Sequence, residues 1–205
     1  MRIAIIYATR EGQTKRIVDH LAGAFRTHDA VVEIFNAKTK PNPDLESYDA
    51  ILVAGSVHIG SHERELVAFA KARREALERV PTAFVSVSLS QAGAEDLRRT
   101  AEQRAQATKN VAGVLDAFFR KTGWQPRWVQ PFAGALLYTK YNFLIRFILK
   151  RISQQEGGSV DTSRDHEYTD WPAVARFAGR ILAETGDDFA LRRPAPVPSA
   201  SCIDQ

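Results

Sequence analysis

Short apolar runs alternate along the chain with longer stretches in which apolar residues recur at helical spacing. The runs are Ile3–Ala8, Ala30–Phe35, Ile51–Gly55, Thr82–Leu89 and Trp128–Leu137. Short unbroken apolar runs are typical of strands that are buried on both faces of a parallel sheet. Strands that alternate with helices in this way predict an α/β domain with a parallel sheet.

Amphipathic stretches follow the strand runs. They extend from Ile17 to Phe25, from Leu66 to about Arg79, and from Glu95 to Lys121, where Gly123 is expected to end the helix. Each predicted helix therefore connects one buried strand to the next.

A last helix is expected to begin at Asp170, which would cap it, with Pro172 in its first turn. It is expected to end before Gly186. Residues 1–186 are thus predicted to form one domain. Residues 187–205, which are rich in Pro and Ala, are predicted to form a flexible tail.

Three polar or small segments follow apolar strands and mark the expected ligand site. In open α/β sheets, ligands bind outside the carboxyl ends of the strands, where the strand order reverses. The segments are Thr9–Thr14, Ser56–His62 and Ser86–Gln91. Within them, the residues predicted to bind a ligand are Thr9, Arg10, Glu11, Gly12, Gln13, Thr14, Ser56, Val57, His58, Ile59, Gly60, Ser86, Val87, Ser88 and Leu89.

The first segment joins a buried strand directly to a helix. Backbone N–H groups at the start of a helix have no partner within it, and the helix dipole favours an anion there. Gly12 permits close approach of the backbone, and Thr9 and Thr14 add hydroxyl donors. The segment therefore favours phosphate binding, although threonines that merely cap the helix would give the same pattern.

Composition and charge narrow the class of protein. With 205 residues, the chain is long enough for one domain with a sizeable core. Its only cysteine is Cys202, so we expect no internal disulfide, no metal cluster and a reducing compartment. We predict neither a signal peptide nor a membrane-spanning helix, because no apolar run approaches about 20 residues.

The net charge of +4 is unevenly distributed, because residues 117–155 hold no acidic residue. The basic residues there are Arg120, Lys121, Arg127, Lys140, Arg146, Lys150 and Arg151. On a helix, Arg146 and Lys150 would lie on one stripe opposite bulky aliphatic side chains, as in helices that rest on an anionic membrane surface. An ordinary core helix with a solvated basic stripe is the alternative. Nucleic acid is disfavoured, because the basic residues alternate with aliphatic ones.

The spacing Thr-x-x-Gly-x-Thr at residues 9–14 resembles the phosphate loop of flavodoxins, which bind flavin mononucleotide (FMN). A wider resemblance includes Thr-Arg-Glu-Gly-Gln-Thr (9–14), Ala-Gly-Ala-Leu (133–136), Gly-Gly-x-x-Asp-Thr (157–162) and Tyr-Thr-Asp-Trp (168–171). These motifs, in this order, are similar to those of the flavodoxin-type, quinone-dependent protoporphyrinogen oxidases of bacteria. A carboxylate at the position of Glu11 is normal in that family.

The resemblance implies a flavodoxin-like, doubly wound sheet of five parallel strands in the order 2-1-3-4-5, with a basic and aromatic helical insert at about 138–168. It implies FMN as cofactor and the removal of six electrons from protoporphyrinogen IX, in three two-electron steps, with menaquinone or ubiquinone as acceptor. The enzyme would lie in the cytoplasm, peripherally associated with the inner face of the cell membrane. A homo-oligomer is left open.

Roles for individual residues follow from this resemblance. The residues expected to meet propionates, lipid phosphates or the macrocycle are Tyr138, Tyr141, Arg146, Lys150 and Arg151. Independently of the resemblance, the place of His58 between a strand end and Gly60 favours a hydrogen bond to the flavin or substrate, and a proton-carrying role is possible there. The alternative for both histidines is a surface position on the loop, and this is the interpretation preferred for His62. The sequence departs from the family at His58-Ile59, where Arg-Tyr is frequent.

Two other functions use the same pattern of residues. One is an electron carrier or FMN-dependent quinone reductase whose insert docks a protein partner. The other is a flavin-free interaction module. The basic insert favours the oxidase, because a carrier that docks on cationic reductases benefits from an acidic face.

Overall fold

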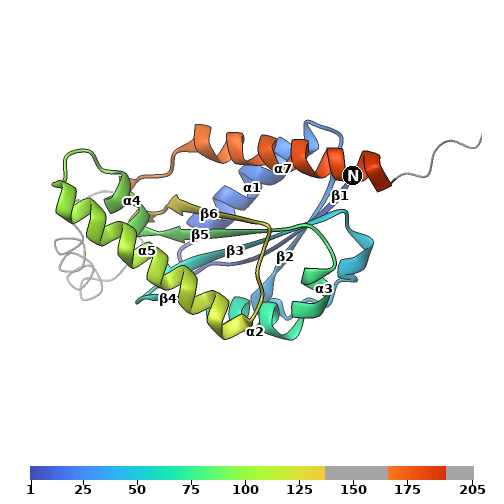
Figure 1. Cartoon of the computed structure of the whole chain (residues 1–205), viewed down its shortest axis with the longest axis horizontal. Helices are drawn as coiled ribbons and strands as arrows, with labels where there is room; N and C mark the ends of the chain where they lie inside the picture. Colours follow the sequence, from blue (N-terminus) through green and yellow to red (C-terminus); the bar gives the residue numbers. More distant parts are fainter. Residues whose placement is uncertain (137–165, 193–205) are drawn as a thin grey trace, which may run out of the picture.

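A computed structural model of the chain describes residues 1–136 and 166–192 (Figure 1). Five parallel strands form its central sheet in the order β2-β1-β3-β5-β6. The strands are β1 (Arg2–Ala8), β2 (Val31–Asn36), β3 (Ala50–His58), β5 (Thr82–Ser88) and β6 (Trp128–Ala133). Counted along the chain, these five follow 2-1-3-4-5, which confirms the predicted order. The two-residue strand β4 (Ser61–His62), which pairs antiparallel with the end of β3, was not predicted.

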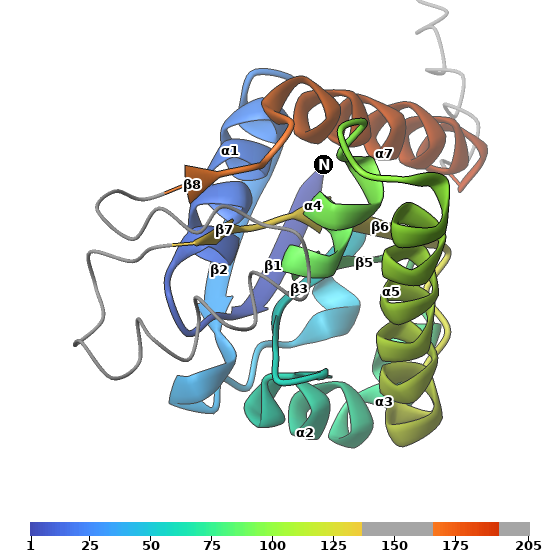
Figure 2. The same cartoon turned by 90° about the vertical axis from the view of Figure 1, so that its left-hand side faces the viewer.

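Helices cover both faces of this sheet (Figures 1 and 2). On one face, α1 and α7 pack in a cluster with alternate strand residues; the other face packs against α2, α3 and α5. The helices are α1 (Gln13–Arg26), α2 (Arg64–Ala72), α3 (Arg74–Glu78), α4 (Leu89–Glu95), α5 (Ala101–Thr122) and α7 (Trp171–Arg192). The smaller elements are two 3-10 turns, η1 (Ala37–Thr39) and η2 (Leu45–Ser47), and the strands β7 (Ala135–Leu136) and β8 (His166–Glu167), which pair with each other.

Strand β1 shows why the strand runs are apolar without alternation. Ile3 and Ile5 pack in the cluster under α1 and α7, whereas Ala4 and Ile6 pack in the cluster on the opposite face. Side chains from Ile3 to Ala8 are therefore buried on both faces of the sheet, which explains why this run is apolar without alternation.

The predicted long helix from Glu95 is wrong at its start. The structure has the separate helix α4, and α5 begins only at Ala101. Thr100 caps α5 in a capping box with Gln103, in which the Thr100 hydroxyl accepts from the Gln103 N–H at 3.3 Å. The predicted helix at 66–79 is likewise divided into α2 and α3.

Three predicted boundaries gave mixed outcomes. Gly123 ends α5 in the left-handed conformation with φ 70°, as predicted. Asp170 caps α7, since its Oδ1 accepts from the Ala173 N–H at 3.0 Å, also as predicted. The expected end before Gly186 is wrong, because α7 continues to Arg192. A glycine inside a helix costs only about 1 kcal/mol, which the remaining residues can offset.

The strand run predicted at Trp128–Leu137 is also divided, because β6 ends at Ala133 and β7 belongs to a different sheet. Strand β6 lies at the edge of the main sheet and contains Pro131, which pairs in register with Ser86 of β5. Most of the predicted insert and the tail from residue 193 lie outside the described residues.

Candidate functional site

The three predicted loops meet at the carboxyl edge of the sheet. Ala8 of β1 pairs in register with Gly55 of β3, which pairs in turn with Ser86 of β5. The three strands therefore end at the same edge of the sheet, the one that faces the viewer in Figure 2.

The first loop has the geometry of an anion site. Gly12 adopts φ 104°, a conformation that favours glycine, and its N–H donates to the Thr9 hydroxyl at 3.1 Å. Among the described residues, no side chain caps the first turn of α1, which begins at Gln13, so its N–H groups are available to a ligand. Thr14 is fully buried, and its hydroxyl has no hydrogen-bond partner within residues 1–136 and 166–192. A phosphate at this helix start would supply that partner and fit the dipole.

The buried carboxylate of Glu63 holds this loop in place through its contacts with basic side chains. Glu63 is only 6% exposed and accepts from the Ser56 hydroxyl at 3.3 Å. Its oxygens lie 3.5 Å from Arg10 Nε and 4.0 Å from Lys38 Nζ, and Lys38 also donates to the Thr9 carbonyl at 2.7 Å. Since a buried charge is costly without partners, Arg10 and Lys38 compensate Glu63 and fix the loop to it.

The second loop is the turn between β3 and β4. Ile59 and Gly60 both have positive φ, at 46° and 69°, and the Ile59 side chain is 85% exposed. His58 Nδ1 lies 4.0 Å from Glu11 Oε1, so this loop meets the first one through a pair of titratable groups. Glu11 therefore turns toward His58.

His62 is not the surface histidine that the sequence suggested. It is 6% exposed, its ring lies edge-on to Phe84 and Phe118, and its Nε2 is 2.9 Å from the Ser86 hydroxyl. The short pairing of β4 with β3 turns the chain back under the sheet and carries His62 inward. Burial and the nearby Lys121 lower the pKa of His62 to about 4, so the imidazole is neutral near pH 7.

The third segment is the start of a helix and not the expected loop through Gln91. Strand β5 ends at Ser88, whose hydroxyl accepts from the Gln91 N–H at 3.1 Å and caps α4, so Leu89 is already helical. Val87 is buried. Because Ser86 contacts His62, the hydroxyls of Ser86 and Ser88 both have partners within the protein.

The Gln13 side chain points toward the residues that precede α7. Its side-chain amide donates to Glu167 Oε1 at 2.7 Å and to the Thr169 hydroxyl at 2.9 Å. Its backbone N–H, in the first turn of α1, is the part that can reach a phosphate.

Several residues of the site were not predicted, and others cannot be placed. The structure adds Lys38, Glu63 and Glu167, which act through contacts with residues distant in the sequence. It also gives a contact with Gln13 to Thr169, which belongs to the Tyr-Thr-Asp-Trp motif but had no predicted role. The predicted substrate and membrane residues Tyr138, Tyr141, Arg146, Lys150 and Arg151 lie outside the described residues.

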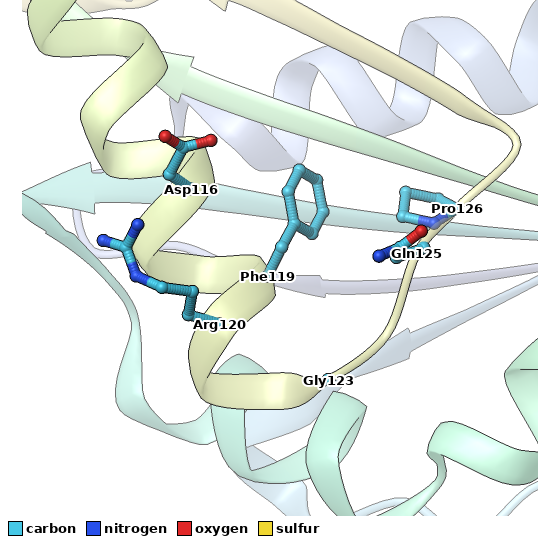
Figure 3. A pocket seen from close by; sticks show the side chains of 6 residues that line it. All are labelled: Asp116, Phe119, Arg120, Gly123, Gln125 and Pro126. Carbon is cyan, nitrogen blue, oxygen red and sulfur yellow. The ribbon is translucent and has the colours of Figure 1, made fainter.

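A depression elsewhere on the surface has a volume of about 610 Å³. It is lined by Asp116, Phe119, Arg120, Gly123, Gln125 and Pro126, whose side chains are drawn in Figure 3. Its lining includes the end of α5 and the approach to β6, and none of the three loops. Among residues 1–136 and 166–192, no group of three or more His, Cys, Asp or Glu could hold a metal ion. Helices in the same ranges are too short or too polar to span a membrane.

Comparison with known proteins identifies the family. Residues 4–163 match the model of the flavodoxin domain. The chain is 32% identical over 192 residues to Escherichia coli (strain K12) protoporphyrinogen IX dehydrogenase [quinone], covering 94% of this chain and 100% of that protein. The chain belongs to this flavodoxin-domain family of quinone-dependent dehydrogenases.

A second relative of this flavodoxin-domain protein is protoporphyrinogen IX dehydrogenase [quinone] of Leishmania major, with 30% identity over 98% of this chain and 80% of the relative. Among solved structures, oxidised Flavodoxin 1 from Bacillus cereus is 14% identical with a TM-score of 0.49, covering 89% of this chain and 98% of that one. Fusobacterium nucleatum flavodoxin bound to flavin mononucleotide is 14% identical with a TM-score of 0.45, covering 91% and 98%.

Proposed function

We propose that this flavodoxin-domain protein oxidises protoporphyrinogen IX to protoporphyrin IX with FMN as cofactor and a quinone as electron acceptor. The observation that carries the proposal is the similarity to a relative named for that activity, over the relative's whole length. The unpartnered, buried Thr14 hydroxyl at the start of α1 adds a site that suits the FMN phosphate.

The first loop would hold the phosphate through the backbone N–H groups that begin α1 and through Thr14 Oγ1. Aliphatic side chains of the second and third segments, Val57, Ile59 and Leu89, would cover the flavin ring and keep water from it. Bound FMN would supply the capacity to accept two electrons from one partner and pass them to another. The protein would contribute orientation, exclusion of water and proton transfer.

Each two-electron oxidation step also removes two hydrogens from the substrate. Conversion of the porphyrinogen to the porphyrin removes six hydrogens, and three quinones take them up as three quinols, so the reaction balances. We propose that His58 receives the proton at a ring nitrogen and that Glu11, 4.0 Å from its Nδ1, orients the imidazole. This arrangement would let protons leave the site at the carboxyl edge of the sheet through the second loop.

The basic and aromatic insert at about 138–168 would bring the apolar substrates to this site. In this proposal, Arg146, Lys150 and Arg151 meet propionates or lipid phosphates, and Tyr138 and Tyr141 stack on the macrocycle. The protein would then associate peripherally with the inner face of the membrane. Sedimentation with vesicles that contain anionic lipid tests this part: Arg146→Glu with Lys150→Glu should abolish binding, and unchanged binding would contradict it.

The function is tested by following porphyrin fluorescence under anaerobic conditions. With FMN-loaded protein, protoporphyrinogen and quinone, fluorescence should rise, and the rise should depend on both FMN and quinone. His58→Gln should lower kcat by about 100-fold while FMN affinity stays within about twofold. Reduction of bound FMN by a flavodoxin reductase, without any reaction with porphyrinogen, would instead indicate an electron carrier. Absence of FMN binding would reject both functions.

A further inference from the structure

Residues 166–169 follow the last strand of the main sheet in the sequence, but they contact residues of the candidate site near the start of the chain. Glu167 is in β8, which pairs with β7 immediately beyond β6. Figure 2 shows β8 beside α1, the helix that begins at the phosphate loop. The segment is therefore in reach of a loop that lies about 150 residues earlier in the chain, as the contact of Gln13 with Glu167 shows.

Gln13 is the centre of this contact. It is 5% exposed, and its amide N–H groups donate to Glu167 and Thr169 while its carbonyl oxygen accepts from Arg16 at 3.0 Å. Thr169 in turn donates to the Ala133 carbonyl at 2.8 Å, at the end of β6. Because a buried polar group that lacks its hydrogen bond is costly, these linked hydrogen bonds fix the side chain of Gln13 relative to the main sheet.

Arg16 strengthens the same connection. It lies 3.1 Å from Glu167 Oε1, and its guanidinium lies 5.4 Å from the centre of the Trp171 ring at the start of α7. The first turn of α1 is thus attached to both β8 and α7.

The segment also reaches the third part of the site. The Tyr168 N–H donates to the Gly134 carbonyl at 3.1 Å, and the Gly134 N–H donates to the Ser88 carbonyl at 3.0 Å. Ser88 is the residue that caps the start of α4. One short segment therefore holds the phosphate loop on one side and the end of β5 on the other.

We propose that Gln13 and Thr169 are positioning residues for the FMN phosphate: they set the place of the first turn of α1 without their side chains contacting the cofactor. The proposal rests on the proposed function, because it assumes that this loop holds the phosphate of FMN. Gly12, at φ 104°, has no side chain with which to fix the start of α1, so the position of this first turn depends on neighbours such as Gln13.

The test compares FMN with riboflavin, which has the same ring and no phosphate. Dissociation constants are measured by quenching of flavin fluorescence in wild type, Thr169→Val, Gln13→Leu and the double variant. Thr169→Val should weaken FMN about 10-fold and riboflavin by less than about twofold. The double variant should bind FMN about as weakly as either single one, because both substitutions break one chain of hydrogen bonds.

Two controls separate positioning from general damage. Thr169→Ser keeps the hydroxyl and should bind FMN as wild type does. Thr108→Val removes an exposed hydroxyl that donates to the Arg104 carbonyl within α5, and it should have no effect on the binding of either flavin. Circular dichroism and thermal melting of the flavin-free variants confirm that they fold.

The outcomes are distinct. Selective loss of FMN with retained riboflavin affinity supports the proposal. Unchanged FMN affinity in Thr169→Val, or equal loss of both flavins, would overturn it and leave the proposed function standing. A wild-type protein that does not bind FMN would overturn both.

Discussion

Thr14 is a buried polar residue without a partner among the described residues, which is unusual in a folded protein. Most buried hydroxyls are hydrogen-bonded, and one that is not lowers the stability of the protein by about 1–3 kcal/mol. Its place in the first turn of α1 gives the exception a reason, since a phosphate there would complete the hydrogen bond.

Thr14→Val should therefore have opposite effects on binding and on stability. FMN should bind about 10- to 100-fold more weakly, because a hydrogen bond to a charged group is lost. The flavin-free protein should be as stable as wild type or more so, because an unpaired buried hydroxyl is gone. Fluorescence titration and urea unfolding measure the two quantities; a variant that loses stability and keeps its FMN affinity would contradict this interpretation.

His62 makes stability depend on pH. Its pKa is about 4 in the native state and about 6.5 when unfolded, so the unfolded state binds the proton more readily between these values. The free energy of unfolding should therefore fall by about 3 kcal/mol as pH decreases from 7 to 4. Urea unfolding across this range should show a weaker pH dependence in His62→Leu, with His28→Gln as the control for loss of a histidine at the surface.

The positions of residues at the carboxyl edge of the sheet were easier to predict from the sequence than the directions of their side chains. Strand ends and loop positions follow from local patterns. The direction of Gln13 depends on Glu167, and that of His62 depends on Phe118. Such distant partners are decided by packing, which no local motif encodes.

At the scale of elements, the five strands of the main sheet and its long helices were predicted from periodicity. The errors concern helix boundaries and two short elements that were missed, α4 and β4. Gly123 ends a helix because it adopts a left-handed conformation, whereas Gly186 lies within one. The sequence does not distinguish these cases, because the conformation of each glycine depends on how the residues after it pack. The start of α5 at Ala101 could have been found from the Thr100-x-x-Gln103 capping box.

Two glycines of α5 and its cap provide a matched test of this point. Gly113→Ala, in the exposed helix interior with nothing within 4 Å of the added Cβ, should raise the free energy of unfolding by about 0.5–1 kcal/mol. Gly123→Ala should lower it by about 1 kcal/mol, because alanine is strained at φ 70°. Urea unfolding of both variants measures the difference, and equal effects would contradict the assigned cap.

At the scale of the whole molecule, the parallel sheet was predictable from the alternation of strands and helices, and a general rule for α/β sheets indicated the edge at which a ligand would bind. The five-strand order followed from the resemblance to flavodoxins. Neither the strand β4 nor the contacts that residues 166–169 make with the start of α1 could be predicted. Strand β4 depends on pairing across a tight turn, and β8 depends on pairing with β7, from which it is distant in the sequence.

Binding of FMN should stabilise the entire domain, because the site joins loops from three strands. At a free concentration 100 times the dissociation constant, a ligand specific for the native state adds about 2.7 kcal/mol. For a chain of this size, Tm should rise by about 5–10 °C. Thermal melting with FMN and with inorganic phosphate alone, at equal concentrations, measures the effect; no rise with FMN would contradict the assigned site.

Pro131 in the edge strand β6 has a consequence for how copies of this protein can meet. An uncovered sheet edge offers a row of N–H and C=O groups to which a strand of another molecule can add, and this is a common route to aggregation. Proline interrupts that row, since it has no N–H to donate. Pro131 therefore removes one backbone donor from β6 and makes the addition of a strand from another copy at this edge less favourable.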